Sequence, residues 1–369
     1  MSDIADLSKG IGISKDQLSA DGEPCILYGE LYTKYKSETI KEVISKTNID
    51  NTKLVKSKAN DVIIPCSGET AEEIATARCV LKDDILLGGD LNIIRLHGYD
   101  GSFMSYQLNG KRKYDIAKVA QGVSVVHLYG EHLKNIKTIN PSLNEQKKIA
   151  NLLSLLDERI STQNKIIEDL KKLKSAIIEI EYSSKTKTSS HIGDFIVQTS
   201  KRNKDNAIRT VLSVSNRRGF IQQSEQFENR CVASDDTSNY KIVERNDFAF
   251  NPARINVGSI ARLITFEKGI VSPMYICFRT KDYATPEYLD YFFESKLFFT
   301  EIQKRLEGSV RQCLSYESLC NIPFPLLAIE VQQRIGKQLF TLAQKIKLET
   351  DFLEILHKQK QHLLRQMFI

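Results

Sequence analysis

The chain has 369 residues, a net charge of +6 at pH 7, 41% hydrophobic residues and 27% charged residues. This length allows two or three ordinary domains, and the composition is typical of a soluble globular protein. No apolar run is long enough to span a bilayer, and the first residues lack the basic and apolar regions of a signal peptide, so we expect a cytoplasmic location and no membrane partner. Seven scattered cysteines, without a C-x-x-C pair or histidines at zinc-ligand spacing, predict free thiols and no metal site.

Basic residues are unevenly distributed along the chain. Residues 183–327 hold 20 Lys and Arg against 16 Asp and Glu, and residues 328–369 hold seven against four. Residues 1–142, in contrast, hold 18 against 19. Domains that bind nucleic acid are often strongly basic. The charge is therefore compatible with nucleic-acid binding without predicting it.

Residues 1–142 are expected to form a first α/β domain. Short apolar runs between turn residues predict strands within 25–32, 61–70 and 84–96, and a helical segment extends from Phe103 to Gln121. Polar and glycine-containing loops occur at K-G-I-G-I-S-K (9–15), S-G-E-T (67–70), G-G-D-L-N (88–92) and K-R-K (111–113). Such residues suit contacts with phosphates and base edges, although a K-R-K run is more often a solvated surface.

Residues 143–182 are predicted to form a long helix. Its seam alternates strictly between steps of four and three residues, which is typical of a coiled coil. The seam residues are Ile149, Leu153, Leu156, Ile160, Ile167, Leu170 and Ile177, with polar breaks at Gln163 and Lys174. At 1.5 Å per residue, such a helix extends for roughly 60 Å.

Residues 183–327 are expected to form a second α/β domain. Strands are predicted at 210–215, 247–255, 258–264 and 269–279, followed by a helix at 286–306. The loop motifs K-R-N-K (201–204) and N-R-R-G (216–219) place basic residues beside asparagine and glycine. A third motif, N-P-A-R-I-N-V-G-S-I (251–260), includes Gly258, which allows the backbone to approach a ligand closely.

Residues 328–369 are predicted to form a second long helix that repeats the first. The two helices align without a gap at a constant offset of 186 residues. The seam returns at Ile335, Leu339, Leu342, Ile346, Leu353, Leu356 and Leu363, with breaks at Glu349 and Lys360. The alignment continues upstream, where residues 116–136 match residues 302–322 with identical pairs such as Asn135 and Asn321. Because even the polar breaks coincide, the chain contains a duplicated unit of a domain and a long helix.

The expected fold is therefore mixed α/β, with two α/β domains separated by two long helices that form an antiparallel coiled coil with a pseudo-twofold repeat. An intermolecular coiled coil is the alternative, but two helices of one chain have a far higher effective concentration. Gln163 and Glu349 lie mid-helix, where they either fix the register or are simply tolerated. Farther upstream the two halves diverge, and there we expect them to differ in function.

No catalytic signature accompanies these elements. The sequence lacks a G-x-x-x-x-G-K-[ST] phosphate loop and a G-x-G-x-x-G motif. His127, His132 and His191 do not have the spacing of metal ligands or of a triad. Residues 251–254, N-P-A-R, are similar to the Asn-Pro-Pro-aromatic motif of amino-methyltransferases, but the second proline and the aromatic residue are missing. A DNA adenine methyltransferase with a degenerate motif and a coiled-coil scaffold that binds only proteins are the alternative hypotheses.

The chain resembles the DNA-specificity subunit of type I restriction-modification systems over essentially its whole length. The resemblance is strongest at P-S-L-N-E-Q-K-K-I-A (141–150), which is similar to the Pro-x-x-x-Glu-Gln-x-x-Ile helix start that follows each target-recognition domain, and it includes F-N-P-A-R-I-N-V-G-S-I-A (250–261). It implies target-recognition domains at 1–142 and 183–327, each reading one half of a bipartite, asymmetric DNA site, and helices at 143–182 and 328–369 that set the gap.

The resemblance also implies the partners and the chemistry. Two modification (methyltransferase) subunits and the restriction subunits would join this chain on double-stranded DNA. S-adenosylmethionine would be bound by the modification subunit, and this chain would bind no cofactor and catalyse no reaction. The expected DNA contacts are Lys9, Lys15, Tyr28, Tyr32, Ser67, Glu69, Thr70, Asn92, Lys111, Arg112, Lys201, Arg202, Asn203, Arg217, Arg218, Asn251, Arg254, Asn256 and Ser259.

Two departures from the family pattern stand out. Val331 occupies the position of the glutamate in the helix start, so we expect either the cap or a partner contact of the second helix to differ from those of the first. The second domain also has a lead-in, residues 182–192, before Gly193 and Asp194, whereas only Met1 precedes the corresponding start of the first domain.

Overall fold

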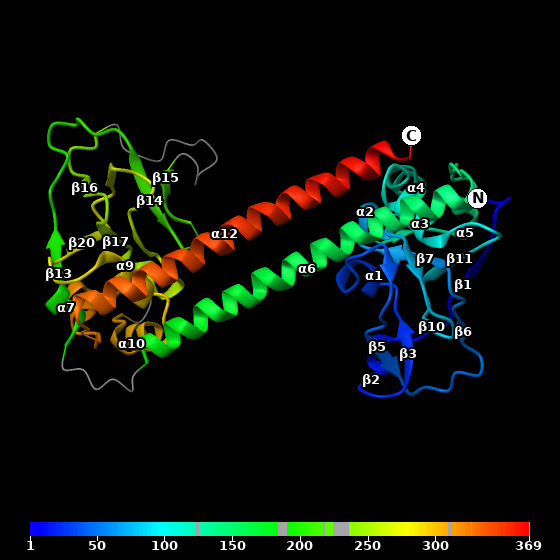
Figure 1. The fold of residues 1–369 in the computed structure, drawn as a ribbon, viewed down its shortest axis with the longest axis horizontal. Helices are drawn as coiled ribbons and strands as arrows, with labels where there is room; N and C mark the ends of the chain where they lie inside the picture. Colours follow the sequence, from blue (N-terminus) through cyan, green and yellow to red (C-terminus); the bar gives the residue numbers. More distant parts are fainter. Residues whose placement is uncertain are drawn as a thin grey trace. The chain divides into compact units, whose positions relative to one another are not determined.

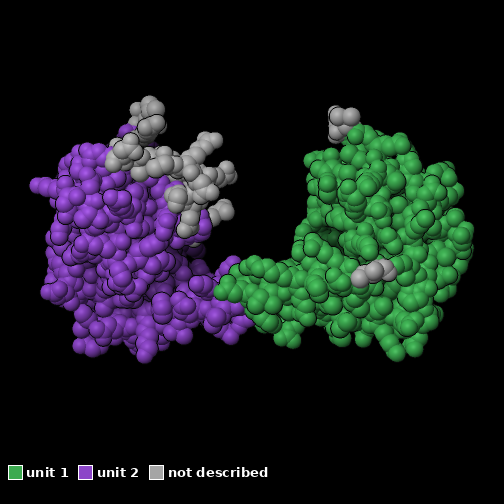
Figure 2. All heavy atoms as spheres, turned by 90° about the horizontal axis from the view of Figure 1, so that it is seen from above, with its two compact units in different colours: residues 1–166, 350–369 green, residues 167–349 purple. Residues whose placement is uncertain are grey.

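The computed structural model describes residues 1–122, 125–183, 190–216, 218–223, 236–308, 312–325 and 327–368. The chain forms two compact units, coloured separately in Figure 2. Unit 1 comprises residues 1–166 and 350–369, and unit 2 comprises residues 167–349. The boundaries lie inside the two long helices, so each long helix contributes to both units (Figure 1).

Unit 1 contains two five-stranded sheets and one two-stranded sheet. The strand orders are β1-β11-β7-β9-β4, β2-β5-β3-β10-β6 and β12-β8. The strands are β1 (Ala5–Lys9), β2 (Leu18–Ser19), β3 (Glu23–Ile26), β4 (Thr39–Ile40), β5 (Ser45–Thr47), β6 (Val55–Lys56), β7 (Asp61–Pro65), β8 (Ser67–Gly68), β9 (Arg78–Val80), β10 (Leu86–Leu87), β11 (Leu91–Leu96) and β12 (Val126–His127). The helices before the first long helix are η1 (Lys15–Gln17), α1 (Glu30–Thr33), α2 (Ala71–Ile74), α3 (Gly101–Asn109), α4 (Lys113–Val119) and α5 (Gly130–Lys134).

The first sheet of unit 1 has an apolar core on each face. Successive side chains of a strand point to opposite faces. In β11, Ile94 therefore packs with Met104 of α3, whereas Ile93 packs with Leu31 of α1 on the other face. These residues are buried almost completely. The sheet is thus held from both sides, and its end at Lys9 and Asn92 borders the surface described below.

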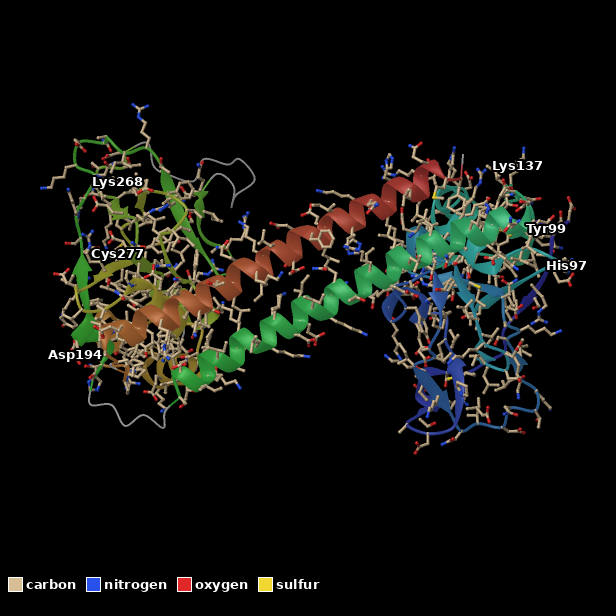
Figure 3. All side chains as sticks on the ribbon, in the orientation of Figure 1. His97, Tyr99, Lys137, Asp194, Lys268 and Cys277 are labelled. Carbon is tan, nitrogen blue, oxygen red and sulfur yellow. The ribbon has the colours of Figure 1, made fainter. Side chains whose placement is uncertain are left out.

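Unit 2 contains two four-stranded sheets, with the orders β13-β20-β17-β18 and β15-β14-β19-β16. The strands are β13 (Ile196–Thr199), β14 (Val211–Ser215), β15 (Gly219–Gln222), β16 (Lys241–Glu244), β17 (Phe248–Phe250), β18 (Ile260–Arg262), β19 (Lys268–Val271) and β20 (Ile276–Thr280). The short helices are α7 (Ile192–Phe195), η2 (Pro252–Val257), α9 (Pro286–Phe292), α10 (Lys296–Arg305) and α11 (Tyr316–Cys320). Figure 3 labels Lys268 at the start of β19 and the buried Cys277 in β20.

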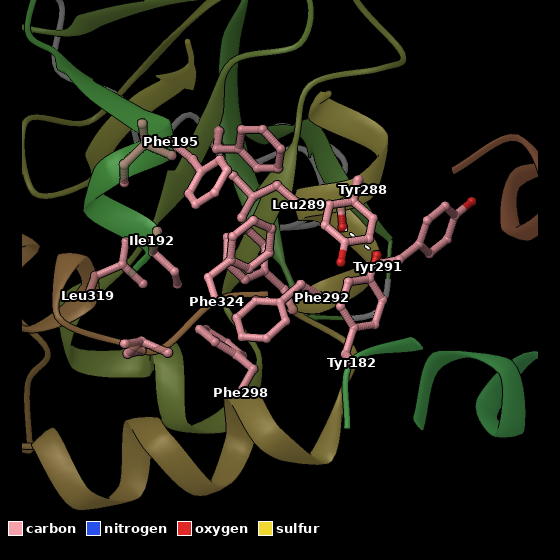
Figure 4. Packing of buried hydrophobic residues seen from close by; sticks show 14 of the residues in the cluster. Tyr182, Ile192, Phe195, Tyr288, Leu289, Tyr291, Phe292, Phe298, Leu319 and Phe324 are labelled. Atoms are coloured by element: carbon pink, nitrogen blue, oxygen red, sulfur yellow. Dashed lines mark hydrogen bonds between the residues drawn. The ribbon is translucent and has the colours of Figure 1, made fainter. Parts of the chain in front are cut away.

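Aromatic side chains fill the larger core of unit 2 (Figure 4). The ring of Phe292 is fully buried and meets Phe324 edge to face at 4.9 Å between centroids. Tyr182, directly after the first long helix, packs on Tyr288 and donates its hydroxyl to the Tyr288 carbonyl at 2.6 Å. Edge-to-face aromatic pairs add to the stabilisation that burial provides. The C-terminal end of the first long helix is therefore fixed in the core of unit 2.

The long helices are α6 (Leu143–Glu181) and α12 (Ile329–Gln366). In unit 1, Ile149 near the start of α6 lies in one apolar cluster with Leu363 near the end of α12. In unit 2, Ile177 near the end of α6 lies in one cluster with Ile335 near the start of α12. The predicted seam residues of both helices are all buried or half-buried. The antiparallel pairing of the helices is thus confirmed.

Several segments that the sequence predicts as single elements are divided. The predicted helix at 286–306 forms α9 and α10, because Ser295 caps a new helix by accepting the Phe298 amide at 3.2 Å. The predicted strand at 247–255 ends at Phe250, because Pro252 begins the 3-10 helix η2. The predicted strand at 269–279 forms β19 and β20, which belong to different sheets. In each case the sequence correctly predicts an apolar segment, but a capping residue or a turn within the segment ends its first helix or strand.

The duplication extends to individual hydrogen bonds. Gln146 Oε1 accepts the amide of Asp100, the N-cap of α3, and its Nε2 donates to the carbonyl of Pro141. Gln332, 186 residues later, accepts the amide of Thr285, the N-cap of α9, and donates to the carbonyl of Leu327. These bonds attach the start of each long helix to the domain that precedes it.

The two helix starts differ at their caps, which is one of the two differences that the sequence predicts. Glu145 Oε2 accepts the Ser142 hydroxyl at 2.7 Å and the Ser142 amide at 3.1 Å, which completes a capping box at α6. The Ser142 donors also hold the pKa of Glu145 below its usual value. Val331 lies at the same position in α12, where it is half-buried and packs against the core of unit 2. Apolar packing thus replaces the polar cap.

Two repeat-related lysines connect each domain to the long helix of the other repeat. Lys360 of α12 lies 2.5 Å from Glu38 Oε2 and 2.6 Å from Asp157 Oδ1 of α6, all within unit 1. Tyr106 donates to Asp157 at 2.8 Å. Burial raises the pKa of Glu38, and the Lys360 ammonium group opposes this shift. Lys174 of α6, the counterpart of Lys360, lies 2.6 Å from Glu294 in unit 2.

A second charged cluster of unit 2 surrounds Asp290. Asp290 Oδ2 lies 3.2 Å from Arg262 Nε, and Glu287 also contacts Arg262. Burial raises the pKa of Asp290 from 3.8 to about 6, although Arg262 opposes the shift. The folded state therefore binds this proton more tightly than the unfolded state. The contribution of Asp290 to stability is complete at low pH and is lost as the pH rises through the folded pKa.

We expect Asp290→Asn to remove this part of the pH dependence. In thermal unfolding followed between about pH 4 and pH 7, the wild-type unit 2 should lose stability relative to the variant as the pH rises. Asp282→Asn is the matched control, since Asp282 is exposed at the surface of the same unit. A pH profile that is identical for the wild type and Asp290→Asn would contradict the assignment.

Candidate nucleic-acid interface

Two glycine-containing motifs of unit 1, 9–15 and 88–92, pack backbone against backbone. The Gly10 amide donates to the carbonyl of Leu91 at 2.9 Å. A Cβ atom on Gly10 would lie only 2.0 Å from the Gly88 carbonyl oxygen. The glycines therefore allow the loop after β1 to approach the loop before β11, which brings two sequence candidates, Lys9 and Asn92, together.

Gly10→Ala should destabilise unit 1 by about 3 kcal/mol or more, because the added methyl group meets backbone atoms that cannot rotate away. The control lies two residues away in the same motif. A Cβ atom on Gly12 meets nothing within 4 Å, so Gly12→Ala should leave the free energy of unfolding nearly unchanged. Denaturant unfolding of the two variants measures the difference. Equal stability of both variants would show that the two loops do not pack as closely as described.

Lys9 and Asn92 are direct cross-strand partners of β1 and β11. They line an open pocket of about 420 Å³ together with Leu7, Ser8, Tyr129, Gly130, Glu131 and Lys134. Asn92 is only 1% exposed, and its Nδ2 donates to the Leu128 carbonyl at 2.9 Å. Ser67, a third candidate, is buried in β8 and pairs with His127 of β12. Three predicted contacts from three motifs thus converge on the segment 126–134.

The segment 126–134 contributes surface residues that were not among the sequence candidates. The Tyr129 ring is 45% exposed, and Lys9 Nζ lies 5.4 Å from its centroid. The ring of His127 stacks on Tyr129 at 6.1 Å, and His132 meets it edge-on at 5.5 Å. Aromatic and basic residues in close alternation are a signal of nucleic-acid binding. That signal is present in V-H-L-Y-G-E-H-L-K (126–134), although no residue of this run was selected as a candidate.

A second group of candidates lines an open pocket of about 600 Å³. Its lining residues are Tyr32, Thr33, Glu69, Glu72, Glu73, Thr76, Arg78 and Lys113. Burial raises the pKa of the Tyr32 hydroxyl, and nearby Tyr28 and the carboxylates of Glu73 and Glu69 add to this shift. Burial lowers the pKa of Lys113, and Arg78 adds to that effect. Because three carboxylates face this pocket, it suits amino groups of bases better than phosphates.

The remaining candidates of unit 1 are dispersed. Lys15 in η1 and Lys111 before α4 are exposed, and Tyr28 is half-buried against the apolar core. Arg112 is half-buried and lies 3.4 Å from Asp115. Thr70 is exposed, and its hydroxyl oxygen caps α2 by accepting the Glu73 amide at 3.2 Å. Lys15 and Lys111 therefore present charge to solvent, whereas the other three side chains also have structural contacts.

In unit 2, the structure brings the 216–219 turn and the 251–260 loop side by side. A Cβ atom on Gly258 would lie 3.7 Å from Asn216 Cβ, and the Ser259 hydroxyl donates to the Val214 carbonyl at 3.3 Å. Gly258 has φ = 86°, in the left-handed region that favours glycine, and it ends η2. Arg218 and Arg254 are exposed on these loops, and Asn256 is half-buried beside the exposed Val257. Arg217 lies outside the described residues.

Three candidates of unit 2 have mainly structural positions. Asn251 is 6% exposed and caps η2, where its Oδ1 accepts the Ala253 amide at 3.1 Å. This position does not resemble a substrate-binding asparagine, which weighs against the methyltransferase alternative. Ser259 is 5% exposed. Asn203 is fully buried, and its amide bonds with both the carbonyl and the amide of Ile208. These side chains shape loops whose exposed neighbours face solvent.

The K-R-N-K motif lies away from the other two motifs of unit 2. Arg202 forms a bridge with Lys241 of β16, at one edge of the sheet β15-β14-β19-β16. The 216–219 turn joins β14 and β15 at the opposite edge. Lys201 and Arg202 are exposed, and Arg202 donates to Asn239 Oδ1 at 2.7 Å. The basic loops of unit 2 therefore form two separate surfaces.

The described part of the chain contains no cluster of metal ligands, and burial disfavours the thiolate form of at least two of its cysteines. No group of His, Cys, Asp or Glu side chains among these residues has the arrangement of metal ligands. The six described cysteines are free thiols, and Cys231 lies outside the described residues. Burial raises the pKa of Cys25 and Cys66 to about 11, which disfavours the reactive thiolate. None of the helices searched among the described residues is long and apolar enough to cross a membrane.

Comparison with known proteins agrees with these features. Residues 1–172 match the family model described as the type I restriction modification DNA specificity domain. The chain is 24% identical to the type I restriction enzyme MjaVIII specificity subunit of Methanocaldococcus jannaschii, over 98% of this chain and 88% of the relative. The fold is similar to the crystal structure of the S subunit of a type I restriction-modification system from M. genitalium, with a TM-score of 0.62 and 17% identity over 100% of this chain and 94% of that chain. A structure described as addressing complex assembly and conformational transition of the type I R-M system has a TM-score of 0.54 and 13% identity, over 98% of this chain and 95% of that chain.

The part of the chain that resembles a DNA specificity domain, residues 1–172, contains the first α/β domain and most of α6. Over nearly its whole length, the chain is thus similar to a specificity subunit of a type I restriction-modification system.

Proposed function

We propose that this chain is a non-catalytic specificity subunit of a type I restriction-modification system and recognises a bipartite, asymmetric DNA sequence. Residues 1–142 read one half-site and residues 183–327 read the other. The observation that carries the proposal is the combination of a shared scaffold and divergent loops. Hydrogen bonds of Gln146 and Gln332 repeat at the same offset, whereas the loops that hold the candidate contacts have no common sequence. Two unlike readers on one repeated scaffold suit an asymmetric target.

Within each domain, exposed basic residues position the DNA backbone, and loop side chains read base edges. The exposed basic candidates are Lys9, Lys15 and Lys111 of unit 1 and Lys201, Arg202, Arg218 and Arg254 of unit 2. Buried candidates such as Asn203 and Asn251 act indirectly by holding the loops. Glu69 and Tyr32, which line one pocket, suit contacts with base amino groups.

The long helices have two proposed roles. Because each helix contributes to both units, its length sets the gap between the half-sites. Linking two modest readers raises affinity strongly only when the spacing suits both. The helices also expose apolar residues, including Leu152 and Leu155 on α6 and Phe340, Leu348 and Ile355 on α12. Such residues support docking of two modification subunits, one for each half of the repeat.

The assembled complex of this chain with its modification subunits tests the role of the loops. Arg254→Gln should weaken binding of the target duplex about fivefold or more and, where the lost contact is a phosphate contact, reduce the salt dependence by about one unit of slope. Arg245→Gln is the matched control, because Arg245 is an exposed arginine of the same unit that pairs with Glu267 at 3.0 Å. If the Arg254→Gln complex and the wild-type complex bind the target duplex with equal affinity, Arg254 and its loop do not contribute to the DNA interface.

A further inference from the structure

Asn92 carries an unused hydrogen-bond acceptor at the pocket that it shares with Lys9. Its Nδ2 faces the carbonyl oxygens of Leu128 at 2.9 Å and Pro65 at 3.5 Å, which fixes the orientation of the amide. Asn92 Oδ1 is buried and accepts no hydrogen bond from the described residues. A buried acceptor without a donor is unfavourable and uncommon in folded proteins. The pocket therefore lacks one hydrogen-bond donor.

Gly130 keeps the space beside this oxygen open. A Cβ atom on Gly130 would lie in ordinary van der Waals contact with Asn92 Oδ1 and Leu7 Cβ, 4.0 Å from each, and no atom from another part of the chain would lie closer. The pocket has a volume of about 420 Å³, which lies within the range of small-molecule sites. A ligand that enters beside Gly130 therefore reaches the acceptor without displacing the backbone.

The rim of the pocket supplies an aromatic face and positive charge. Tyr129 is exposed, and the ammonium group of Lys9 lies 5.4 Å from the centre of its ring. Lys134, which also lines the pocket, pairs with Glu131 at 2.6 Å. A nucleotide matches these three features, because its base stacks on an aromatic ring, its phosphate pairs with a lysine and an exocyclic amino group donates a hydrogen bond.

The pocket is specific to the first half of the repeat. At the offset of 186 residues, Ser315 replaces Tyr129, Tyr316 replaces Gly130 and Cys320 replaces Lys134. The strand registers of β1 with β11 and of β13 with β20 place Ile276 at the position of Asn92. The side chains of the pocket thus differ between the two halves, although residues 116–136 belong to the aligned segment.

We propose that this pocket binds one unpaired nucleotide whose base carries an exocyclic amino group, with that group donating to Asn92 Oδ1 and the phosphate near Lys9. A base inside a duplex cannot enter the pocket, because its edge is held in the stack. A free nucleotide and an unpaired nucleotide of a bound DNA strand share this chemistry. The second source rests on the proposed DNA-recognition function, whereas the first does not.

Calorimetric titration of the full chain tests the proposal. 2′-Deoxyadenosine 5′-monophosphate should bind saturably, and the 2′-deoxynebularine analogue, which has the same purine without its amino group, should bind about tenfold more weakly. Gly130→Ala places a methyl group in the pocket and should weaken binding of the adenine nucleotide to a similar extent, about tenfold. Gly12→Ala, which adds a methyl group in open space of the same unit, should bind like the wild type.

A short single-stranded oligodeoxyadenylate distinguishes the two sources. Tighter binding than the mononucleotide indicates a nucleotide of a DNA strand, and equal binding indicates a free nucleotide. The proposal is overturned when neither ligand binds saturably, or when binding is indifferent to both the amino group and Gly130→Ala. Duplex binding by the assembled complex is measured separately, so a loss of nucleotide binding with intact duplex recognition refutes only the pocket.

Discussion

Lys360→Met should lower the free energy of unfolding of unit 1 by roughly 3–5 kcal/mol, because it leaves two buried carboxylates without their cation. The Lys360, Glu38 and Asp157 side chains are 13%, 8% and 8% exposed. The ammonium group connects α12 to both α6 and the first domain, so its loss should also increase hydrogen exchange at the end of α12. Denaturant unfolding and amide exchange of unit 1 measure the two effects.

Lys358→Met is the control on the same helix. Lys358 is 72% exposed. Among the residues that the structure describes, its ion pair is with Glu354, one turn earlier in the helix. Exposed pairs of this kind contribute a few tenths of a kcal/mol, so we expect a change below about 0.5 kcal/mol. Adding Glu38→Gln to Lys360→Met should restore part of the loss, since it removes one of the uncompensated charges. Similar losses for the Lys358 and Lys360 variants would contradict the proposed connection.

Removing one heptad from each long helix should shorten the gap in the recognised DNA by about three base pairs, since seven residues extend about 10 Å and one base-pair step about 3.4 Å. Residues 160–166 and 346–352 are suitable, because they occupy the same repeat positions and their deletion preserves the seam in both helices. Adenine methylation mapped in cells that carry the variant and the modification subunit measures the new gap.

Deletion of residues 160–166 alone is the matched comparison. It leaves the two helices with unequal lengths, so seam contacts such as Ile149 with Leu363 and Ile177 with Ile335 can no longer form together. We expect the single deletion to abolish methylation. An unchanged gap after the double deletion would show that the helices do not determine the spacing.

The long helices and their pairing follow from local sequence patterns. The steps of four and three residues from Ile149 to Ile177 predict the seam. The capping box of Ser142 and Glu145 was not predicted, although S-L-N-E has the spacing of one. The coincidence of Lys174 with Lys360 was also visible in the sequence. Their partners were not, because Glu38 and Glu294 reach these lysines only through the tertiary fold.

The sequence predicted which loops form the candidate site better than it predicted the role of each side chain. Exposed arginines and lysines such as Arg254 and Lys9 followed from the loop motifs. Asn92 and Asn203 were expected to contact DNA, yet cross-strand pairing and a buried loop place their amides in the interior. Tyr129 was not selected, because its importance depends on the neighbouring strand that supplies Lys9. Such residue roles depend on contacts between distant segments that no local pattern records.

The most direct measurement is a genome-wide map of methylated adenine in cells that contain this chain and its modification subunit, compared with cells that contain the modification subunit alone. The map should show one asymmetric sequence, made of two short specified segments that an unspecified stretch of fixed length separates. Substitutions at Arg254 should alter one segment and leave the other unchanged. A single continuous recognition sequence, or methylation that is the same with and without this chain, would contradict the assignment of one half-site to each domain.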